Sequence, residues 1–254
     1  MKRLFIALLA GILCTALSGC PVFKHGDRIF QYSTLGALSA GVYEGTLPLC
    51  TLSQKGDFGI GTFNPLDGEM IFLDGVIYQA RVDGTVATPG GATLSPYAIV
   101  HKFDADATFT VDAGLDYTAL KETLDTHLES RNLFHAFRID GVFPSIRVRS
   151  VPAQVRPFPP LADVVANQQQ VFDLTDIEGT MVGYWCPAYI GGFNVAAYHL
   201  HFISKDRQHG GHVLEVQTGD ATVEMDALHD YRVVLPDTQD FLEADLDPVS
   251  KTVL

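Results

Sequence analysis

The chain has 254 residues, 47% of them apolar, and a formal net charge of −13. This length allows one large domain, or two small domains that share an interface, with a substantial core. The negative charge argues against nucleic acid as a partner, because nucleic-acid-binding proteins need a basic face. An anionic small molecule is not excluded, because a local cationic site can still bind it.

Residues 1–19 have the features of an export signal. Lys2-Arg3 gives a basic start, residues 4–17 are almost continuously apolar, and the run ends in Leu17-Ser18-Gly19-Cys20. This ending is similar to the lipobox of bacterial lipoproteins, which predicts cleavage before Cys20 and a lipid on that cysteine. The run is shorter than the ~20 residues of a membrane-spanning helix. We expect an exported, membrane-anchored lipoprotein in the periplasm or at the cell surface; an ordinary cleaved signal or a short membrane anchor is the alternative.

A short tether is expected to follow the lipidated cysteine, over residues 20–29. The next stretch, residues 32–43, is rich in small side chains and predicts a helix. Ser33 or Thr34 is a suitable N-cap, because a side-chain oxygen there accepts a hydrogen bond from the first helical turn.

Three Asp-Gly pairs between apolar runs predict tight turns that join paired strands. They are Asp74-Gly75 between residues 70–73 and 76–79, Asp83-Gly84 between Val82 and Thr85, and Asp140-Gly141 between Ile139 and Val142. This part of the chain is therefore expected to be rich in hairpins.

One clear helix lies between these turns. Asp116 is a typical N-cap, and Leu120, Leu124 and Leu128 recur at every fourth position, on one helix face. Further along, residues 152–160 hold four prolines and predict a crossing between two halves of the molecule.

These signals predict an α+β fold in two parts, with mixed or antiparallel β-sheets and few helices. We expect an N-terminal β-rich subdomain over residues 30–160. A C-terminal metal-binding subdomain is expected over residues 161–254, where the chain again has the pattern of short strands.

The second part contains the most informative feature of the chain, a pair of histidines followed by a third. His199 and His201 are two residues apart in an apolar run, so on a strand they point to the same face. The polar stretch 205–211 ends in two glycines, which favours a chain reversal. The run 212–216 can return beside the first strand and bring His212 next to the pair. Three imidazoles on one face are a ligand set with which catalytic zinc keeps a position open for substrate.

A single histidine on an apolar strand is more often an ordinary core or surface residue. Three that a hairpin brings together favour a metal site. His209 lies in the proposed turn and is expected to face solvent. The other histidines have no partner at ligand spacing and are interpreted as ordinary residues: His25, His101, His127, His135 and His229.

The cysteines divide according to the predicted cleavage. Cys14 leaves with the signal peptide and Cys20 carries the lipid, so Cys50 and Cys186 remain. Outside the cytoplasm these two could form a disulfide. The sequence does not show whether they are close, and their pairing stays open.

Several motifs, in order along the chain, resemble the alpha-acetolactate decarboxylase family. The run Gly56-Asp57-Phe58-Gly59-Ile60-Gly61-Thr62-Phe63-Asn64-Pro65-Leu66-Asp67-Gly68-Glu69 looks like the N-terminal signature of that family, and residues 70–79 continue it. Residues 140–152 and 179–183 are similar to later family blocks, and the histidine hairpin matches the metal motif of the family. The resemblance extends over about residues 32–246 and is more specific than the histidines alone.

The resemblance implies a zinc-dependent carboxy-lyase that converts 2-acetolactate to acetoin and carbon dioxide, a step of acetoin biosynthesis. It also implies a two-part architecture and a homodimer. The matching residues are His199, His201 and His212 as zinc ligands, Glu69 as a carboxylate at the metal, Arg149 as the active-site arginine and Thr62 as a threonine that lines the site.

The chemistry of this substrate is consistent with such a site. 2-Acetolactate is a β-keto acid, so loss of carbon dioxide leaves electron density that the neighbouring ketone accepts as an enediolate. A zinc ion held by three neutral imidazoles would chelate the substrate hydroxyl and ketone and stabilise the enediolate. Glu69 as a fourth ligand would reduce the charge of the site; alternatively, it binds the metal only in some states or orients a water.

Arg149 is expected to position the substrate carboxylate and then to hold the developing enediolate, because a guanidinium is a poor proton donor. Strand alternation places Arg147 on the same face as Arg149, so only the resemblance favours Arg149. Without the resemblance, Glu69 would be a solvated carboxylate beside a turn, and Thr62 an ordinary strand residue.

The sequence departs from the family pattern near its C-terminus. Family members usually continue beyond residues 241–246 to a glutamate that reaches the metal, whereas residues 248–254 carry no carboxylate. Glu243 and Asp245 precede the usual position. The difference predicts a slower protonation step, altered stereochemical control or water as the proton donor.

Two other functions stay open from the sequence. A lipid-anchored module that binds a metal or a small ligand without turnover would explain the histidines and the C-terminal difference. It explains less well why Thr62, Glu69 and Arg149 occur together. A different zinc enzyme, a hydrolase or a cupin-like oxygenase, is less well supported, because the chain lacks His-Glu-x-x-His and has no Glu after His201 at the usual cupin spacing.

Overall fold

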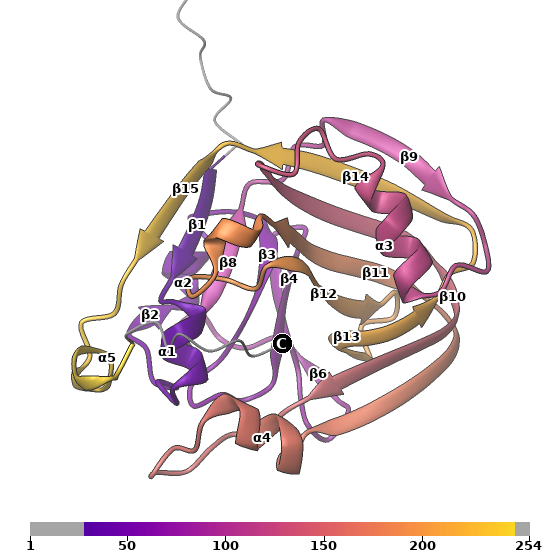
Figure 1. Cartoon of the computed structure of the whole chain (residues 1–254). Helices are drawn as coiled ribbons and strands as arrows, with labels where there is room; N and C mark the ends of the chain where they lie inside the picture. Colours follow the sequence, from indigo (N-terminus) through magenta and orange to yellow (C-terminus); the bar gives the residue numbers. More distant parts are fainter. Residues whose placement is uncertain (1–27, 247–254) are drawn as a thin grey trace, which may run out of the picture.

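The computed structural model describes residues 28–246, which form two large β-sheets packed face to face, with short helices at their edges (Figure 1). The predicted signal peptide and Cys20 lie outside the described residues. The few helices and the predominance of antiparallel pairing confirm the expected fold class. Within residues 28–246, no helix is long and apolar enough to cross a membrane.

The first sheet has seven strands and is antiparallel except at one edge, where β1 and β15 run parallel. Its strands in spatial order are β15 (Asp230–Val234), β1 (Arg28–Tyr32), β8 (Ala98–His101), β3 (Phe58–Thr62), β4 (Glu69–Leu73), β5 (Val76–Ala80) and β6 (Val86–Ala87). Every residue of β3 and β4 is buried, because both faces of the sheet are covered there. One face packs on the second sheet, and the other carries the short helix α2 (Leu49–Leu52).

The second sheet has six strands and is entirely antiparallel. In spatial order they are β11 (Gln170–Cys186), β12 (Ala197–Ser204), β13 (Gly210–Gln217), β10 (Phe134–Ser150), β14 (Ala221–Leu228) and β9 (Ala107–Val111). Because β11 pairs with β10 as well as with β12, strands β10 to β13 form a closed ring of strand pairs. The helix α3 (Tyr117–Asp125) packs on the apolar side chains of this sheet through Leu120 and Leu124.

The remaining elements are short and lie around the edges of the sheets. They are α1 (Leu35–Ser39), β2 (Leu47–Pro48), β7 (Leu94–Ser95), α4 (Leu161–Gln168), the single-turn η1 (Ala188–Ile190) and α5 (Gln239–Glu243). The helices α1 and α4 pack against each other through Leu38 and Val164, and they form a small apolar cluster of their own.

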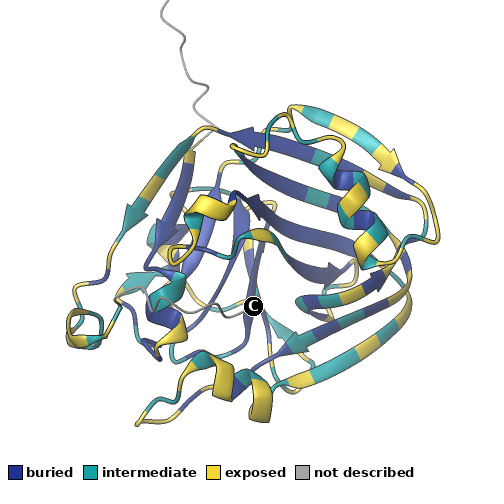
Figure 2. Cartoon of the chain, in the orientation of Figure 1, coloured by how far each residue is buried: buried dark blue, intermediate teal, exposed yellow. Residues whose placement is uncertain are grey.

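A continuous apolar core joins the two sheets. Ile60 and Ile71 from the first sheet pack with Val182 and Ile203 from the second, and all four side chains are fully buried. Figure 2 shows the same arrangement as buried strands at the centre and exposed residues on the helices and the outer strands. This interface matters for function because the metal-ligand candidates lie on the face of the second sheet that it covers.

Two of the three Asp-Gly turns are confirmed. Asp74 and Gly75 join β4 to β5 with φ of 52° and 78°, the pair of positive values that a tight hairpin turn requires. Gly84, with φ of 84°, lies in the turn between β5 and β6, where the amide of Thr85 bonds to the Asp83 carboxylate.

The third predicted turn, at Asp140-Gly141, is wrong, because β10 continues through these residues. Gly141 pairs with Gly179 on one side and with Ala221 on the other. A Cβ on Gly141 would lie 2.7 Å from the Cβ of Ala221. The glycine therefore permits a close approach of two strands.

One predicted helix is confirmed and the other is much shorter than expected. Asp116 caps α3 by accepting a hydrogen bond from the Ala119 amide, as predicted. Residues 32–43 hold only the five-residue α1, because Tyr32 belongs to β1 and Gly41, with φ of 94°, turns the chain after the helix. Thr34, one of the two suggested caps, accepts the hydrogen bond from Ala37.

The proline-rich segment 152–160 lies in the connection from β10 to β11, two strands that pair along almost their whole length. Each sheet draws strands from both sides of residue 160, at which the sequence predicts a subdomain boundary. In the first sheet β15 pairs with β1, and in the second β11 pairs with β10. The strand β1 also begins at Arg28, inside the segment assigned to the tether.

The two cysteines whose pairing the sequence left open are both free thiols. Cys50 is exposed, whereas Cys186 ends β11 and is buried in the core between the sheets. Burial raises the pKa of the Cys186 thiol to about 12.

The fully buried His135 on β10 predicts that the protein loses stability in mild acid. It packs near Trp185, and burial lowers its pKa from 6.5 to about 4. The unfolded chain therefore binds a proton below pH 6.5 that the folded protein resists. Stability falls as the pH drops from about 6.5 to about 4, by roughly 2–3 kcal/mol from this residue. Chemical denaturation of the wild type and His135→Phe at several pH values measures it, and the variant should lose less stability over this range. Equal pH dependence of the two proteins would contradict the assignment.

Candidate metal centre and substrate cavity

The three histidines of the predicted hairpin come together in the structure. His199 and His201 lie on β12, and His212 lies on β13 directly opposite His201 in the strand pairing. One ring nitrogen of each lies within 4.8 Å of the other two, and the Nε2 atoms of His199 and His201 are 3.2 Å apart. His209 is exposed in the turn, as expected.

The hairpin is formed as predicted, but its two glycines do not make the turn. The chain reverses at residues 205–209, and Gly210 and Gly211 already belong to β13. Gly211 has φ of 154°, and a Cβ there would lie 2.5 Å from the carbonyl oxygen of Arg149. The glycine thus lets β13 lie against β10 next to His212.

A backbone contact from the other sheet orients one imidazole. His201 Nδ1 lies 2.8 Å from the carbonyl oxygen of Met70 on β4. A carbonyl oxygen can only accept, so Nδ1 carries the hydrogen and the lone pair of Nε2 points to the other two histidines. Second-layer bonds of this kind fix the tautomer of metal-binding histidines.

The imidazoles are held in the neutral form that binds metal. Burial lowers the pKa of His201 to about 4, and burial together with the neighbouring histidine lowers the pKa of His199 and His212 well below the usual value. Among the described residues, the Nδ1 atoms of His199 and His212 are buried without a hydrogen-bond partner. Three neutral imidazoles with available nitrogen lone pairs fit a divalent transition metal such as zinc.

Glu69 lies beside the histidines, at the start of β4 and one residue before Met70. Its Oε2 is 3.6 Å from His201 Nε2, and the residue is 8% exposed. Burial raises its pKa to about 7, although the positive charge of Arg149 acts in the opposite direction. A carboxyl group that is partly protonated at neutral pH can give or take a proton.

Thr62 lies at the end of β3, directly opposite Glu69 in the strand pairing. Its hydroxyl donates to the carbonyl of Gly68 at 2.7 Å, so its proton is already used. The hydroxyl oxygen can still accept a hydrogen bond from a molecule in the cavity. The sequence placed Thr62 at the site, and the structure places it in the wall of the cavity.

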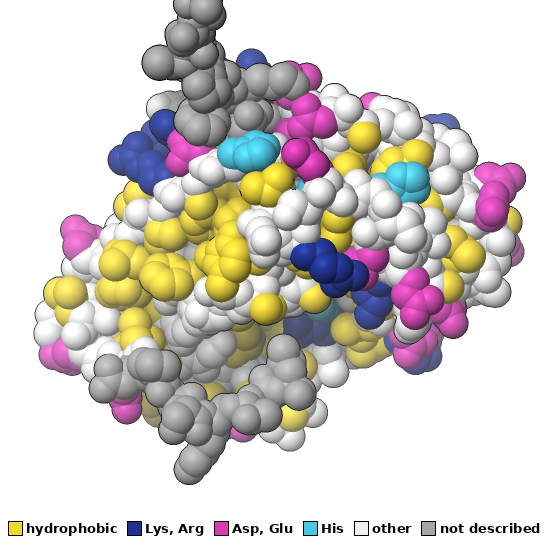
Figure 3. All heavy atoms as spheres, turned by 45° about the horizontal axis from the view of Figure 1, so that its top comes forward, with side chains coloured by type: hydrophobic (Ala, Val, Ile, Leu, Met, Phe, Trp, Pro, Cys, Tyr) yellow, Lys and Arg dark blue, Asp and Glu magenta, His cyan; other side chains and the backbone are white. Residues whose placement is uncertain are grey.

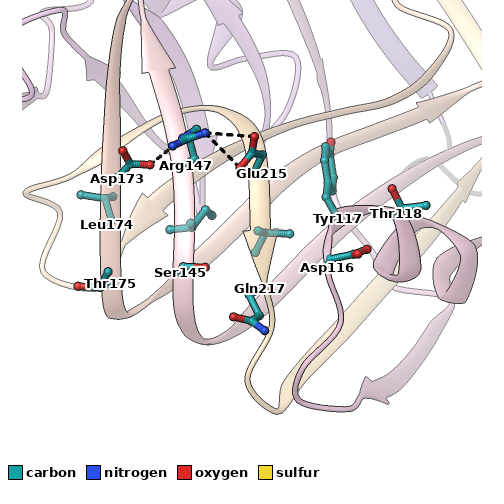
Figure 4. Close-up of a pocket in the computed structure, with 12 residues that line it drawn as sticks. Asp116, Tyr117, Thr118, Ser145, Arg147, Asp173, Leu174, Thr175, Glu215 and Gln217 are labelled. Atoms are coloured by element: carbon teal, nitrogen blue, oxygen red, sulfur yellow. Dashed lines mark hydrogen bonds and ion pairs between the residues drawn. The ribbon is translucent and has the colours of Figure 1, made fainter.

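The structure distinguishes Arg149 from Arg147, which alternation alone could not do. Arg149 lines the cavity with the histidines and, within residues 28–246, makes no ion pair with a carboxylate. Arg147 lies outside the cavity, between Asp173 and Glu215, and forms ion pairs with both (Figure 4). The positive charge of Arg147 is thereby neutralised, whereas that of Arg149 faces the cavity.

A bulge in β13 accounts for this arrangement. Arg147 pairs with Glu215, but Val148 pairs with Val213, so Leu214 is an extra residue in the strand. A bulge of one residue puts His212 and Glu215 on the same face, although they are three positions apart. Each of the two arginines therefore has its own neighbour on β13.

The histidines, Glu69, Thr62 and Arg149 line one cavity of about 130 Å³. The rest of its wall is mainly apolar and comes from α1, α4, β3 and four loops: Leu35, Leu38, Gly61, Leu66, Tyr97, Val151, Leu161 and Val195. Leu66 has φ of 64°, a rare conformation for a bulky residue that marks a constrained site. Gly61, Leu66 and Val151 stood in motifs that resemble the family, whereas Tyr97, Leu161 and Val195 had no such signal.

Comparison with known proteins identifies the family. A family model for alpha-acetolactate decarboxylase matches residues 29–248. The chain belongs to the alpha-acetolactate decarboxylase family. It is 44% identical to the alpha-acetolactate decarboxylase of Methanosarcina mazei. The match extends over 222 residues, which are 87% of this chain and 76% of that protein. With the enzyme of Bacillus licheniformis it shares 39% identity over 227 residues, 89% of each chain.

The fold agrees with that of a solved family member. The crystal structure of alpha-acetolactate decarboxylase from Bacillus subtilis matches with a TM-score of 0.85 at 40% identity, over 87% of this chain and 94% of that chain. The expected resemblance over about residues 32–246 is therefore confirmed.

A buried polar network holds one wall of the cavity in this family member. Asn194 accepts a hydrogen bond from the Tyr97 hydroxyl at 2.8 Å, and its amide donates to Gln31 and to Tyr231. The neighbouring Val195 bonds back to the Asn194 side chain through its amide. Tyr97 and Val195 both line the cavity, so the network ties this wall to the first sheet through Gln31 and Tyr231.

Removal of one imidazole tests the metal centre. His199→Ala is expected to lower metal affinity roughly 100-fold or more, because it removes one of three ligands. Among residues 28–246, His199 makes no contact equivalent to the His201–Met70 bond, so the hairpin should stay folded. Elemental analysis of purified protein measures the bound metal, with His209→Ala in the turn as the matched control. Full metal retention in His199→Ala would exclude the three-histidine centre.

Proposed function

We propose that the protein decarboxylates 2-acetolactate to acetoin and carbon dioxide in a zinc-dependent reaction. Membership of the alpha-acetolactate decarboxylase family supports the reaction. The single observation that carries the proposal is the cavity, which combines three neutral imidazoles with a cation that has no carboxylate partner among the described residues. A small anionic substrate that reacts through a ketone fits this combination.

We assign zinc binding to His199, His201 and His212, with Glu69 close enough to contribute a fourth ligand. When bound, zinc supplies Lewis acidity that draws electron density toward the oxygens of the substrate hydroxyl and ketone. Neutral imidazoles would leave the charge of the ion undiminished, whereas coordination by Glu69 would reduce it.

Arg149 binds and orients the substrate. Its guanidinium stays protonated and offers paired donors that match a carboxylate. As the bond to the carboxyl carbon breaks, the electron pair moves toward the ketone and negative charge develops on the enediolate oxygens. Arg149 beside them stabilises this charge in an environment from which water is largely excluded.

Glu69 is suited to the protonation step. Decarboxylation leaves a carbon that must gain a proton to give acetoin. Burial of Glu69 raises its pKa and so favours the protonated form, which can deliver this proton. Thr62 Oγ1, directly opposite in the strand pairing, can accept a hydrogen bond from the substrate hydroxyl and so hold it near Glu69.

The apolar wall selects and shields the substrate. 2-Acetolactate carries two methyl groups, and side chains such as Leu38, Leu66 and Val195 can pack against them. The same side chains exclude water, which strengthens the interactions of Arg149 with the developing charge.

The environment of the enzyme is a separate part of the proposal. The ending Leu17-Ser18-Gly19-Cys20 supports a lipoprotein that is exported to the periplasm or cell surface and held in the membrane by a lipid on Cys20. The resemblance to the family supports a homodimer.

Paired arginine variants test the reaction. Arg149→Ala is expected to lower kcat/KM for 2-acetolactate about 100-fold or more, because it removes the unpaired cation from the cavity. Arg147→Ala, on the same strand and face but outside the cavity, should retain most of the activity. Acetoin and carbon dioxide released by the zinc-loaded protein are measured, with the metal-free protein as a further control.

Each outcome of this experiment is informative. Turnover that needs zinc and Arg149, but not Arg147, supports the decarboxylase. No turnover by a wild-type protein that binds one zinc tightly would contradict the proposed activity and favour a binding module of the same fold.

The lipid anchor has its own test. Cys20→Ser is expected to release the protein from membranes into the soluble fraction, because the lipid has no other attachment site. Fractionation of cells that express the wild type or the variant measures this, with Cys50→Ser as the matched control. Unchanged membrane association of Cys20→Ser would contradict the lipobox interpretation.

A further inference from the structure

A hollow on the outer side of the first sheet is lined mainly by basic side chains. Arg28, Lys55, Lys102 and Arg232 surround a volume of about 210 Å³, together with Phe30 and Gln54. We call these four cations the basic face. The cluster stands out because the chain as a whole has 17 basic and 30 acidic residues.

Three neighbouring strands and one helix supply the basic face. Arg28 begins β1, Arg232 lies opposite Phe30 on β15, and Lys102 follows the last residue of β8. Lys55 follows α2, which covers this side of the sheet. In Figure 3, Lys and Arg side chains gather at the edge of the molecule on the side where β1 and β15 lie.

Most of this charge is available to a partner. Arg28 pairs with Asp230, and Lys55 lies 5.7 Å from the centre of the Phe30 ring. Within the part of the chain that the structure describes, Lys102 and Arg232 have no ion pair or hydrogen bond through their side chains. All four residues are exposed, so they can meet a charged surface without structural change.

We propose that the basic face docks on the anionic lipid headgroups of the membrane that holds the protein. The inference rests on the proposed lipid anchor, because Arg28 follows Cys20 by only eight positions. An extended chain of that length reaches at most ~29 Å, so a lipid on Cys20 keeps the basic face close to the bilayer.

Docking through this face sets the orientation of the enzyme. Each cation close to an anionic membrane increases partitioning about fivefold, whereas the acidic remainder of the surface is repelled. The helices α1 and α4, which line the cavity, lie beyond the far end of β1 from Arg28 (Figure 1). The docked protein therefore keeps its cavity directed away from the bilayer and open to a soluble substrate.

Vesicle binding by protein without lipid tests this proposal independently of the anchor. The mature chain with Cys20→Ser is sedimented with vesicles of phosphatidylcholine alone, or of phosphatidylcholine mixed with phosphatidylglycerol. We expect binding to the anionic vesicles only, weakened by added salt. In the same background, Lys102→Gln with Arg232→Gln should lower the partition coefficient about 30-fold, since two cations are removed.

A matched pair of variants distinguishes the effect of the basic face on vesicle binding from the effect of net charge. Lys121→Gln with Lys205→Gln makes the same change in net charge on α3 and after β12, and should leave vesicle binding nearly unchanged. Turnover of 2-acetolactate in solution should be the same for both pairs of variants, which shows that the fold and the active site are intact.

Several results would overturn the proposal. One is equal binding to neutral and anionic vesicles, and another is an equal effect of the two variant pairs. The third is no binding to vesicles by the parent protein, in which Cys20→Ser is the only change. Loss of binding in inorganic phosphate, but not in chloride of equal ionic strength, would identify a pocket for small anions in place of a membrane contact. Failure here leaves the anchor and the decarboxylase untouched, because cell fractionation and turnover measure those separately.

Discussion

The hydrogen bond between His201 and the carbonyl of Met70 joins the candidate metal centre to the rest of the fold. It crosses from the second sheet to the first and fixes which nitrogen of His201 faces the other two histidines. Met70 is the neighbour of Glu69 on β4, and Glu69 lies opposite Thr62 on β3. One contact between the sheets therefore sets the distance between the histidines of one sheet and the polar groups of the other. The packing of the two sheets determines the site as much as the hairpin does.

Exclusion of water explains the protonation states of the imidazoles and of the Glu69 carboxyl group in this cavity. Burial disfavours charge, so it lowers the pKa of the three imidazoles and raises that of Glu69. The result is neutral metal ligands and a carboxyl group that can still hold a proton. Arg149 adds a positive charge to the same cavity. The cavity thus has one permanent positive charge and an apolar wall, and both follow from the same packing.

The sequence predicted what depends on local patterns and missed what depends on distant partners. Alternation and a polar turn were enough to bring His199, His201 and His212 together. The Asp-Gly pair at residue 74 makes a turn and that at residue 140 does not, because strands from distant parts of the chain pair on both sides of Gly141. Arg147 and Arg149 share a face, and the bulge in β13 gives each its own neighbour, so that Arg149 lines the cavity and Arg147 does not. Tyr97 and Val195 reach the cavity wall through a network of buried side chains, which leaves no periodic trace in the sequence.

An acidic protein can take an anionic substrate when its charges are arranged in this way. The carboxylates that give the chain its net charge of −13 lie mostly at the surface, where salt screens them over about 8 Å. Inside the cavity the balance is different, because Glu69 is partly protonated and Arg149 has no carboxylate partner among the described residues. The field that a substrate carboxylate meets there is positive even before a metal is considered. The same separation of local from overall charge applies on the outer side of the first sheet, where the four cations of the basic face stand apart from the acidic remainder of the molecule. Net charge thus governs the solubility of the protein, whereas the placement of a few cations determines where an anion is attracted.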